Sequence, residues 1–145
     1  MPRRVLGIDP GLKRIGLAIS DPTGLIARPL TVLQHRSRQQ DVAAICEVVR
    51  QQEVGLIVVG QSFQEDGKPN EAGRRAARLA EALRAETGLP VILWDEAFTT
   101  QDARAIRLEM GVRRRDRQGH LDSLAAALLL QSYLDATVDL MRRES

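Results

Sequence analysis

The sequence predicts an α/β fold: a central mixed five-stranded sheet, three antiparallel strands followed by two parallel ones, with helices on both faces. Two observations predict it. Short apolar runs joined by turns open the chain, and helix-spaced apolar patterns then alternate with further apolar runs. At 145 residues, with 43% hydrophobic and 28% charged residues, the chain fits one domain. We place this domain at residues 1–137 and expect a frayed C-terminal tail at 138–145.

The first three strands are expected to form an antiparallel meander. Residues 5–8 and 15–19 are apolar runs joined by a Pro10-Gly11 turn. The segment 21–24 reads Asp-Pro-Thr-Gly, which predicts a second tight turn before a strand at 27–33. Because both connections are short, each strand should pair antiparallel with the next one.

Two helix-strand units follow. A helical apolar pattern covers 41–52, and the continuous apolar run at 55–60 is typical of a strand covered on both faces. A second helix is expected over 71–86, closed by Gly88, before a strand at 91–94. Four arginines of this second helix are expected to be solvated: Arg74, Arg75, Arg78 and Arg84.

The remainder of the chain is expected to be helical. Thr99 with Asp102 resembles a capping box that opens a helix closed by Gly111, and a last helix is predicted over 121–133. Four arginines form a short basic linker between these helices: Arg113, Arg114, Arg115 and Arg117. This order of elements fits the ribonuclease H architecture.

Composition restricts the function classes. Aromatic residues make up only 3% of the chain, so binding through rows of stacked bases is not expected. Cys46 is the single cysteine and lies on an apolar helical face, which indicates a buried thiol rather than a nucleophile. No signal-peptide pattern or membrane-spanning segment occurs, so we expect a cytoplasmic protein without a membrane partner.

Three acidic residues occur where apolar elements end or begin: Asp9 after the first strand, Glu96 after the strand at 91–94, and Asp122 at the start of the last helix. Ligands of open sheets gather at the C-terminal ends of strands, so these carboxylates are expected to cluster. Clustered carboxylates are costly without cations, and oxygen ligands without His or Cys favour Mg²⁺ or Mn²⁺. Two-metal phosphodiester cleavage uses such an arrangement, in which one ion activates water and the other stabilises the leaving oxygen.

Each carboxylate also has an ordinary structural explanation. Asp9 begins an Asp-Pro-Gly turn, and Glu96 and Asp122 suit the first turn of a helix. Asp95 is a further candidate ligand, since either Asp95 or Glu96 can face the metal while the other caps the helix or faces away. The location that the carboxylates share favours the metal site.

Three segments read GIDPGLKRIGLAISD at 7–21, DEAFTTQDA at 95–103 and LDSLAAALLLQSYLD at 121–135. In this order they resemble the YqgF family, also called RuvX, of pre-16S rRNA nucleases and Holliday-junction-resolvase-like proteins related to RuvC. The resemblance implies a metal-dependent hydrolase of structured nucleic acid that processes the 5′ end of the 16S rRNA precursor. The catalytic, metal-binding carboxylates that it implies are Asp9, Glu96 and Asp122.

The chain departs from the family's pattern at two places. Gly60-Gln61-Ser62 replaces Gly-Leu-Pro, and Ala97 replaces an Arg, which removes a candidate phosphate contact. Other basic residues near the carboxylates are candidates for contacting the nucleic-acid backbone: Lys13, Arg14, Arg104, Arg113, Arg114, Arg115 and Arg117.

Several functional alternatives stay open. They are a Holliday-junction-type DNA resolvase, a non-catalytic nucleic-acid-binding module of the same fold, and phosphotransfer. The sequence does not distinguish pre-rRNA from branched DNA, endonuclease from exonuclease cleavage, or a monomer from a homodimer. Ribosomal precursor particles are a further candidate partner.

Overall fold

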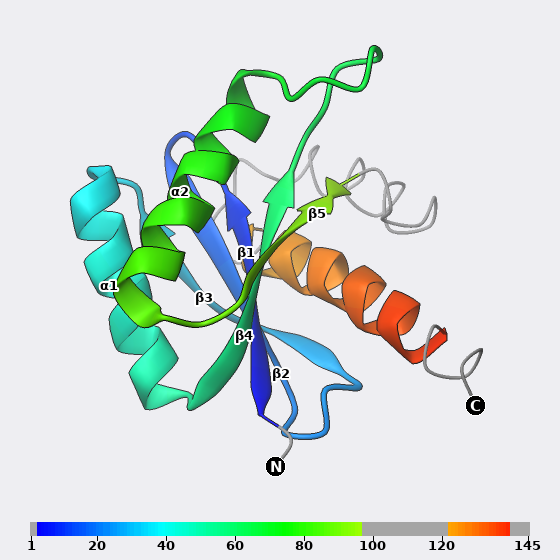
Figure 1. Cartoon of the computed structure of the whole chain (residues 1–145). Helices are drawn as coiled ribbons and strands as arrows, with labels where there is room; N and C mark the ends of the chain where they lie inside the picture. The colour runs from blue at the N-terminus through cyan, green and yellow to red at the C-terminus, as the bar shows by residue number, and fades with distance from the viewer. Residues whose placement is uncertain (1–2, 97–121, 140–145) are drawn as a thin grey trace, which may run out of the picture.

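The computed structural model describes residues 3–96 and 122–139, and a five-stranded sheet forms its centre (Figure 1). The strands are β1 (Arg4–Pro10), β2 (Arg14–Ser20), β3 (Ala27–Gln34), β4 (Val54–Gln61) and β5 (Val91–Asp95). Their order across the sheet is β3-β2-β1-β4-β5. β2 is antiparallel to β1 and β3, whereas β4 is parallel to β1 and β5. The predicted mixed sheet is confirmed.

Helices cover both faces of this sheet. α1 (Arg38–Gln51) and α2 (Glu71–Thr87) lie side by side on one face, and the helix over 122–139, here called the C-terminal helix, crosses the other (Figure 1). Because side chains alternate along a strand, β1 contributes to two apolar clusters. Leu6 and Ile8 pack with α1 and α2, while Val5 packs with the C-terminal helix.

Capping residues mark where α1 and α2 begin and where α2 ends. Ser37 caps α1, where its side chain accepts a hydrogen bond from the backbone N–H of Gln40. Asn70 caps α2 by accepting from the backbone N–H of Gly73. Gly88 ends α2 in the left-handed conformation, with φ of 70°, as its position in the sequence predicted.

Among the described residues, Cys46 and two arginines expected to be solvated, Arg75 and Arg84, are buried to a different extent than predicted. Cys46 is half-buried rather than buried: it packs against the apolar cluster beneath α1, and burial raises the pKa of its thiol. Arg84 is not fully solvated, because its Nε and Nη2 donate to the carbonyl oxygen of Val91 at 3.2 and 2.7 Å. This contact joins the end of α2 to the start of β5.

The C-terminal helix continues through residue 139, so the first two residues of the tail expected to fray, 138–145, are helical. The helix predicted between Thr99 and Gly111 and the basic linker at 113–117 lie outside the described residues. Within 3–96 and 122–139, no helix is both long enough and apolar enough to cross a membrane.

Candidate metal centre

Asp9 lies near the C-terminal end of β1 and faces the C-terminal helix. Gly7 identifies this face, because a β-carbon added to Gly7 would lie 2.7 Å from Leu130 Cβ. Side chains two residues apart in a strand share a face, so Asp9 points to the same side of the sheet. Its side chain is half-buried there.

Gly16 brings the start of the C-terminal helix onto the sheet. It pairs with Asp9 in the antiparallel β1–β2 ladder. A β-carbon added to Gly16 would lie only 2.0 Å from the backbone carbonyl oxygen of Asp122, so any larger residue would displace this helix. The glycine therefore allows Asp122 to lie over the strand position that pairs with Asp9.

Gly60, on the other side of β1, lies against both the C-terminal helix and Glu96. Ile8 pairs with Val59 in the parallel β1–β4 ladder. The next residue of each strand, Asp9 in β1 and Gly60 in β4, therefore lies beside the other. A β-carbon added to Gly60 would lie 2.6 Å from Leu129 Cδ2 and 3.3 Å from Glu96 Oε1. Glu96 thus lies over β4, on the sheet face that Asp9 also occupies.

The strand register directs the side chain of Asp95 to the sheet face opposite the one on which Glu96 lies. Trp94 faces the C-terminal helix, where its Nε1 donates to Ser132 Oγ at 2.9 Å. By alternation Asp95 points to the opposite face. Its partner in the ladder, Gln61, also faces that side, since Gln61 Nε2 donates at 3.1 Å to a backbone carbonyl of α2.

An ion pair joins one of the three carboxylates, Asp122, to the hairpin formed by β1 and β2. Arg14, at the start of β2, places its Nε 2.6 Å from Asp122 Oδ2, and the two side chains are 26% and 10% exposed. Of the two hairpin cations expected to meet phosphate, Arg14 is therefore engaged with Asp122, whereas Lys13 is exposed in the turn. The other expected phosphate contacts lie outside the described residues: Arg104, Arg113, Arg114, Arg115 and Arg117.

The donor set fits a hard divalent cation. Three carboxylates from one sheet face, without His or Cys, offer the oxygen ligands that Mg²⁺ or Mn²⁺ prefers. Among the described residues, however, no group of three or more His, Cys, Asp or Glu side chains is arranged so that it could hold a metal ion. Asp122 is held by Arg14 in this arrangement.

Neither glycine was singled out as a site residue from the sequence. In the sequence, both glycines, Gly16 and Gly60, lie within apolar runs. A usable signal was present, because glycine inside a strand often marks a close approach by another backbone or by a ligand. Arg38, Arg75 and Arg78, which border a pocket near the first hairpin, were also not recognised as a group.

The fold is that of the ribonuclease H-like resolvases. RuvC of Thermus thermophilus, solved in complex with a Holliday junction substrate, is similar with a TM-score of 0.61 at 23% identity, over 93% of this chain and 96% of that chain. The yeast mitochondrial Holliday junction resolvase gives a TM-score of 0.59 at 14% identity, over 97% of this chain and 81% of that chain.

Sequence comparison defines the family. The model described as RuvX, Holliday junction resolvase, matches residues 3–136. A protein of Syntrophus aciditrophicus named "Putative pre-16S rRNA nuclease" is 45% identical, over 92% of this chain and 89% of its own. One of the same name from Anaeromyxobacter sp. is 43% identical, over 91% and 96%. The chain belongs to the RuvX family, also called YqgF.

Proposed function

We propose that this protein is a divalent-metal-dependent nuclease that hydrolyses phosphodiester bonds of structured nucleic acid, and that its substrate is the 5′ end of the 16S rRNA precursor. The observation that carries the proposal is that Asp9, Glu96 and Asp122 share one sheet face, where Gly16 makes room for Asp122 beside Asp9. Relatives named for pre-16S rRNA, at 36–45% identity, support the choice of substrate.

Each carboxylate has a role in this proposal. Asp9, Glu96 and Asp122 hold Mg²⁺ or Mn²⁺, which when bound supplies an activated water and stabilises the leaving oxygen. Glu96 rather than Asp95 is the ligand, because the register directs Asp95 to the α2 face. Arg14 balances the charge of Asp122 when the ion is absent.

The basic residues contact the sugar-phosphate backbone, which gives affinity without sequence readout. Lys13 is exposed in the turn next to β1 and is available for such a contact. The remaining members of this set are Arg104, Arg113, Arg114, Arg115 and Arg117. We place the reaction in the cytoplasm, on ribosomal precursor particles.

The test is cleavage of a labelled 16S precursor RNA, with Mg²⁺, Mn²⁺ or EDTA, by purified protein. Wild type should cut the RNA only with metal, and Asp9→Asn and Glu96→Gln should be at least about 100-fold slower, because each removes one charged ligand. Asp95→Asn is the matched control and should keep most of the activity. Circular dichroism confirms that each variant folds.

Two results would overturn the proposal. Equal metal-dependent cleavage by wild type and Asp9→Asn would remove the carboxylate site from the reaction. Tight RNA binding without cleavage under either metal would instead support a non-catalytic module of the same fold.

Resolution of Holliday junctions is the second candidate, favoured by the description of the family model. Symmetric cutting of a four-way junction requires two active sites, so this function requires a dimer. A labelled DNA junction added to the same assay, with sedimentation to measure the oligomeric state, distinguishes the two. Paired symmetric cuts by a dimer, with intact precursor RNA, would select the resolvase.

A further inference from the structure

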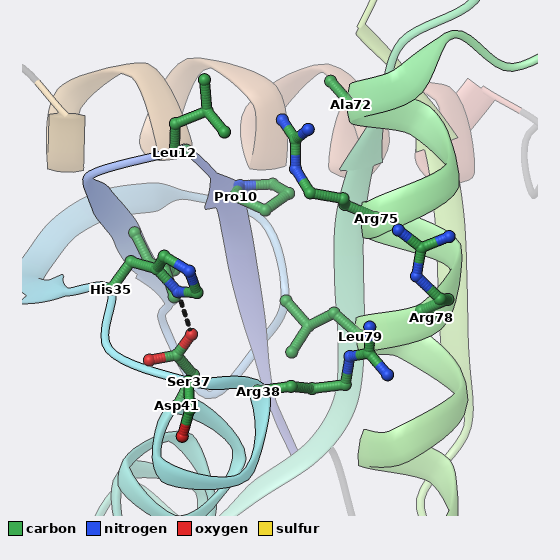
Figure 2. Close-up of a pocket in the computed structure, with 12 residues that line it drawn as sticks. Pro10, Leu12, His35, Ser37, Arg38, Asp41, Ala72, Arg75, Arg78 and Leu79 are labelled. Carbon is green, nitrogen blue, oxygen red and sulfur yellow. Dashed lines mark hydrogen bonds and ion pairs between the residues drawn. The ribbon is translucent and has the colours of Figure 1, made fainter.

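A surface pocket of about 300 Å³ lies between α1, α2 and the turn that joins β1 to β2 (Figure 2). Three arginines line it, and we call it the arginine pocket: Arg38 from α1, with Arg75 and Arg78 from α2. Arg38 extends from α1 toward α2, and Arg75 extends from α2 toward the turn (Figure 2). Arg75 and Arg78 are three residues apart and therefore lie on one side of their helix.

These arginines lack the partners that other helical arginines have. Within the described ranges, three arginines of α1 and α2 form ion pairs, each with the glutamate three residues before it. These pairs are Arg50 with Glu47, Arg74 with Glu71 and Arg84 with Glu81. The residue three positions before Arg75 is Ala72, and three before Arg78 is Arg75 itself. In the described part of the chain, no carboxylate forms an ion pair with any arginine of the pocket.

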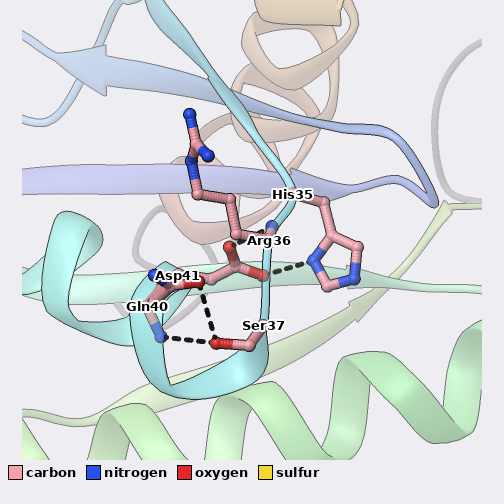
Figure 3. Close-up of polar contacts among 5 residues, drawn as sticks. All are labelled: His35, Arg36, Ser37, Gln40 and Asp41. Atoms are coloured by element: carbon pink, nitrogen blue, oxygen red, sulfur yellow. Dashed lines mark hydrogen bonds and ion pairs between the residues drawn. The ribbon is translucent and has the colours of Figure 1, made fainter.

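Asp41, an acidic residue in the pocket lining, is paired with His35, which also lines the pocket, rather than with an arginine (Figure 3). It is only 5% exposed, and its Oδ2 lies 2.5 Å from His35 Nδ1. Its Oδ1 accepts a hydrogen bond from the backbone N–H of Arg36 at 3.0 Å. Both carboxylate oxygens therefore have donors other than the guanidinium groups. The pocket gathers three cations around space that an anion can fill.

The residues that line the pocket favour a phosphate group as its ligand. Guanidinium groups bind phosphate oxygens through paired hydrogen bonds, and the N-terminal end of α1 adds partial positive charge beside Arg38. Pro10 and Leu79 supply apolar walls, and Leu12 at the rim is 69% exposed. Such a surface suits a sugar or base attached to the phosphate. We propose that the arginine pocket binds the phosphate groups of a nucleotide, either free or within a nucleic-acid strand.

This site is separate from the carboxylates. Asp9 faces the C-terminal helix, while the arginine pocket opens on the α1 and α2 side of the sheet. The two share one end of β1, since Pro10 and Gly11 line the pocket directly after Asp9. A strand that crosses this turn can reach both sites, but phosphate binding in the pocket does not depend on the proposed nuclease reaction.

Calorimetric titration at low ionic strength in EDTA tests the proposal without any cleavage. The probes are pyrophosphate, a nucleoside triphosphate, the corresponding nucleoside without phosphate, and a single-stranded RNA of about ten nucleotides. The test protein is the double variant Arg75→Gln/Arg78→Gln. The matched control is Arg50→Gln/Arg74→Gln, which removes the same charge from exposed positions on α1 and α2 outside this pocket.

We expect wild type to bind phosphate-bearing probes, and the pocket variant to weaken that binding at least about tenfold, while the control stays within about twofold. Pocket-dependent binding of the triphosphate identifies a free nucleotide as the source of phosphate. Pocket-dependent binding of the RNA alone identifies a strand. The proposal fails if wild type binds no phosphate probe, if the nucleoside binds as tightly as the triphosphate, or if both double variants weaken binding equally.

Discussion

Arg14 and Asp122, 108 residues apart in the sequence, are joined by an ion pair in which Nε lies 2.6 Å from Oδ2. The pair connects the first residue of β2 to the start of the C-terminal helix. It therefore stabilises the close packing of this helix on β2 that Gly16 allows. Both side chains are largely shielded from water, which makes this pair stronger than the exposed pairs on α1 and α2.

Arg14→Gln should therefore destabilise the metal-free protein. Removing a charged partner from a mostly buried carboxylate should lower the free energy of unfolding by about 1–3 kcal/mol. Urea unfolding in EDTA measures the change. Lys13→Gln, at the exposed neighbouring position, is the matched control and should change stability by no more than about 0.5 kcal/mol. Equal losses in the two variants would contradict a specific role for the Arg14–Asp122 pair.

Divalent metal should stabilise the folded protein if the carboxylates hold an ion. At a free Mg²⁺ concentration about ten times Kd, binding to the folded state alone adds about 1.4 kcal/mol. Thermal unfolding at constant ionic strength should show a higher Tm with Mg²⁺ for wild type and no shift for Asp9→Asn. Asp66→Asn, in an exposed loop, should keep the wild-type shift. An unchanged Mg²⁺ shift in Asp9→Asn would place the ion elsewhere.

Gly16→Ala should disrupt the contact between β2 and the C-terminal helix. The new methyl group would lie 2.0 Å from the carbonyl oxygen of Asp122, which is backbone and cannot rotate away. Overpacking of this kind costs about 1–3 kcal/mol. Urea unfolding should show a lower midpoint for the variant than for wild type. A midpoint equal to that of wild type would show that the helix shifts without cost.

The strands and their directions were predictable because each is a short apolar run bounded by Gly, Pro or polar turns. β4 was recognised as a buried parallel strand because it is apolar at every position from 56 to 59. The helix predicted over 71–86 agrees with α2 (Glu71–Thr87) to within one residue at each end. The start of α1 was predicted three residues too late, since capping by Ser37 depends on backbone geometry that a single sequence shows only weakly.

The sequence suggested Asp9, Glu96 and Asp122 from their positions at the ends of elements, and their role as metal ligands stays a prediction. That Asp95 points away from the sheet face of Asp9 follows from the β4–β5 register, which the sequence alone did not show. The Arg14 pair could not be foreseen, because a contact over 108 residues depends on how the last helix docks. The arginine pocket could not be predicted for the same reason, because its residues come from two helices and a turn that only the folded structure brings together.

Asp21 gives a measurable pH effect at the far end of β2. The hydroxyl of Thr23 donates to Asp21 Oδ2, and the backbone N–H groups of Ile26 and Leu25 donate to Oδ1 at 3.0 and 2.9 Å. These hydrogen bonds, with that from Thr23 the largest contribution, lower the pKa of Asp21 from 3.8 to about 2. They favour the ionised carboxylate in the folded state.

Because the pKa of Asp21 is lower in the folded protein than in the unfolded chain, its contribution to stability is complete above the unfolded value, near 3.8, and is lost as the pH falls through about 2. The carboxyl carbon shift of Asp21, followed by NMR from neutral to acid pH, should report the low pKa. Thr23→Val should raise that pKa toward its ordinary value by removing the largest cause. Asp21→Asn should flatten the dependence of stability on pH between these two values. A wild-type carboxyl that titrates near 3.8 would contradict the hydrogen-bonded turn.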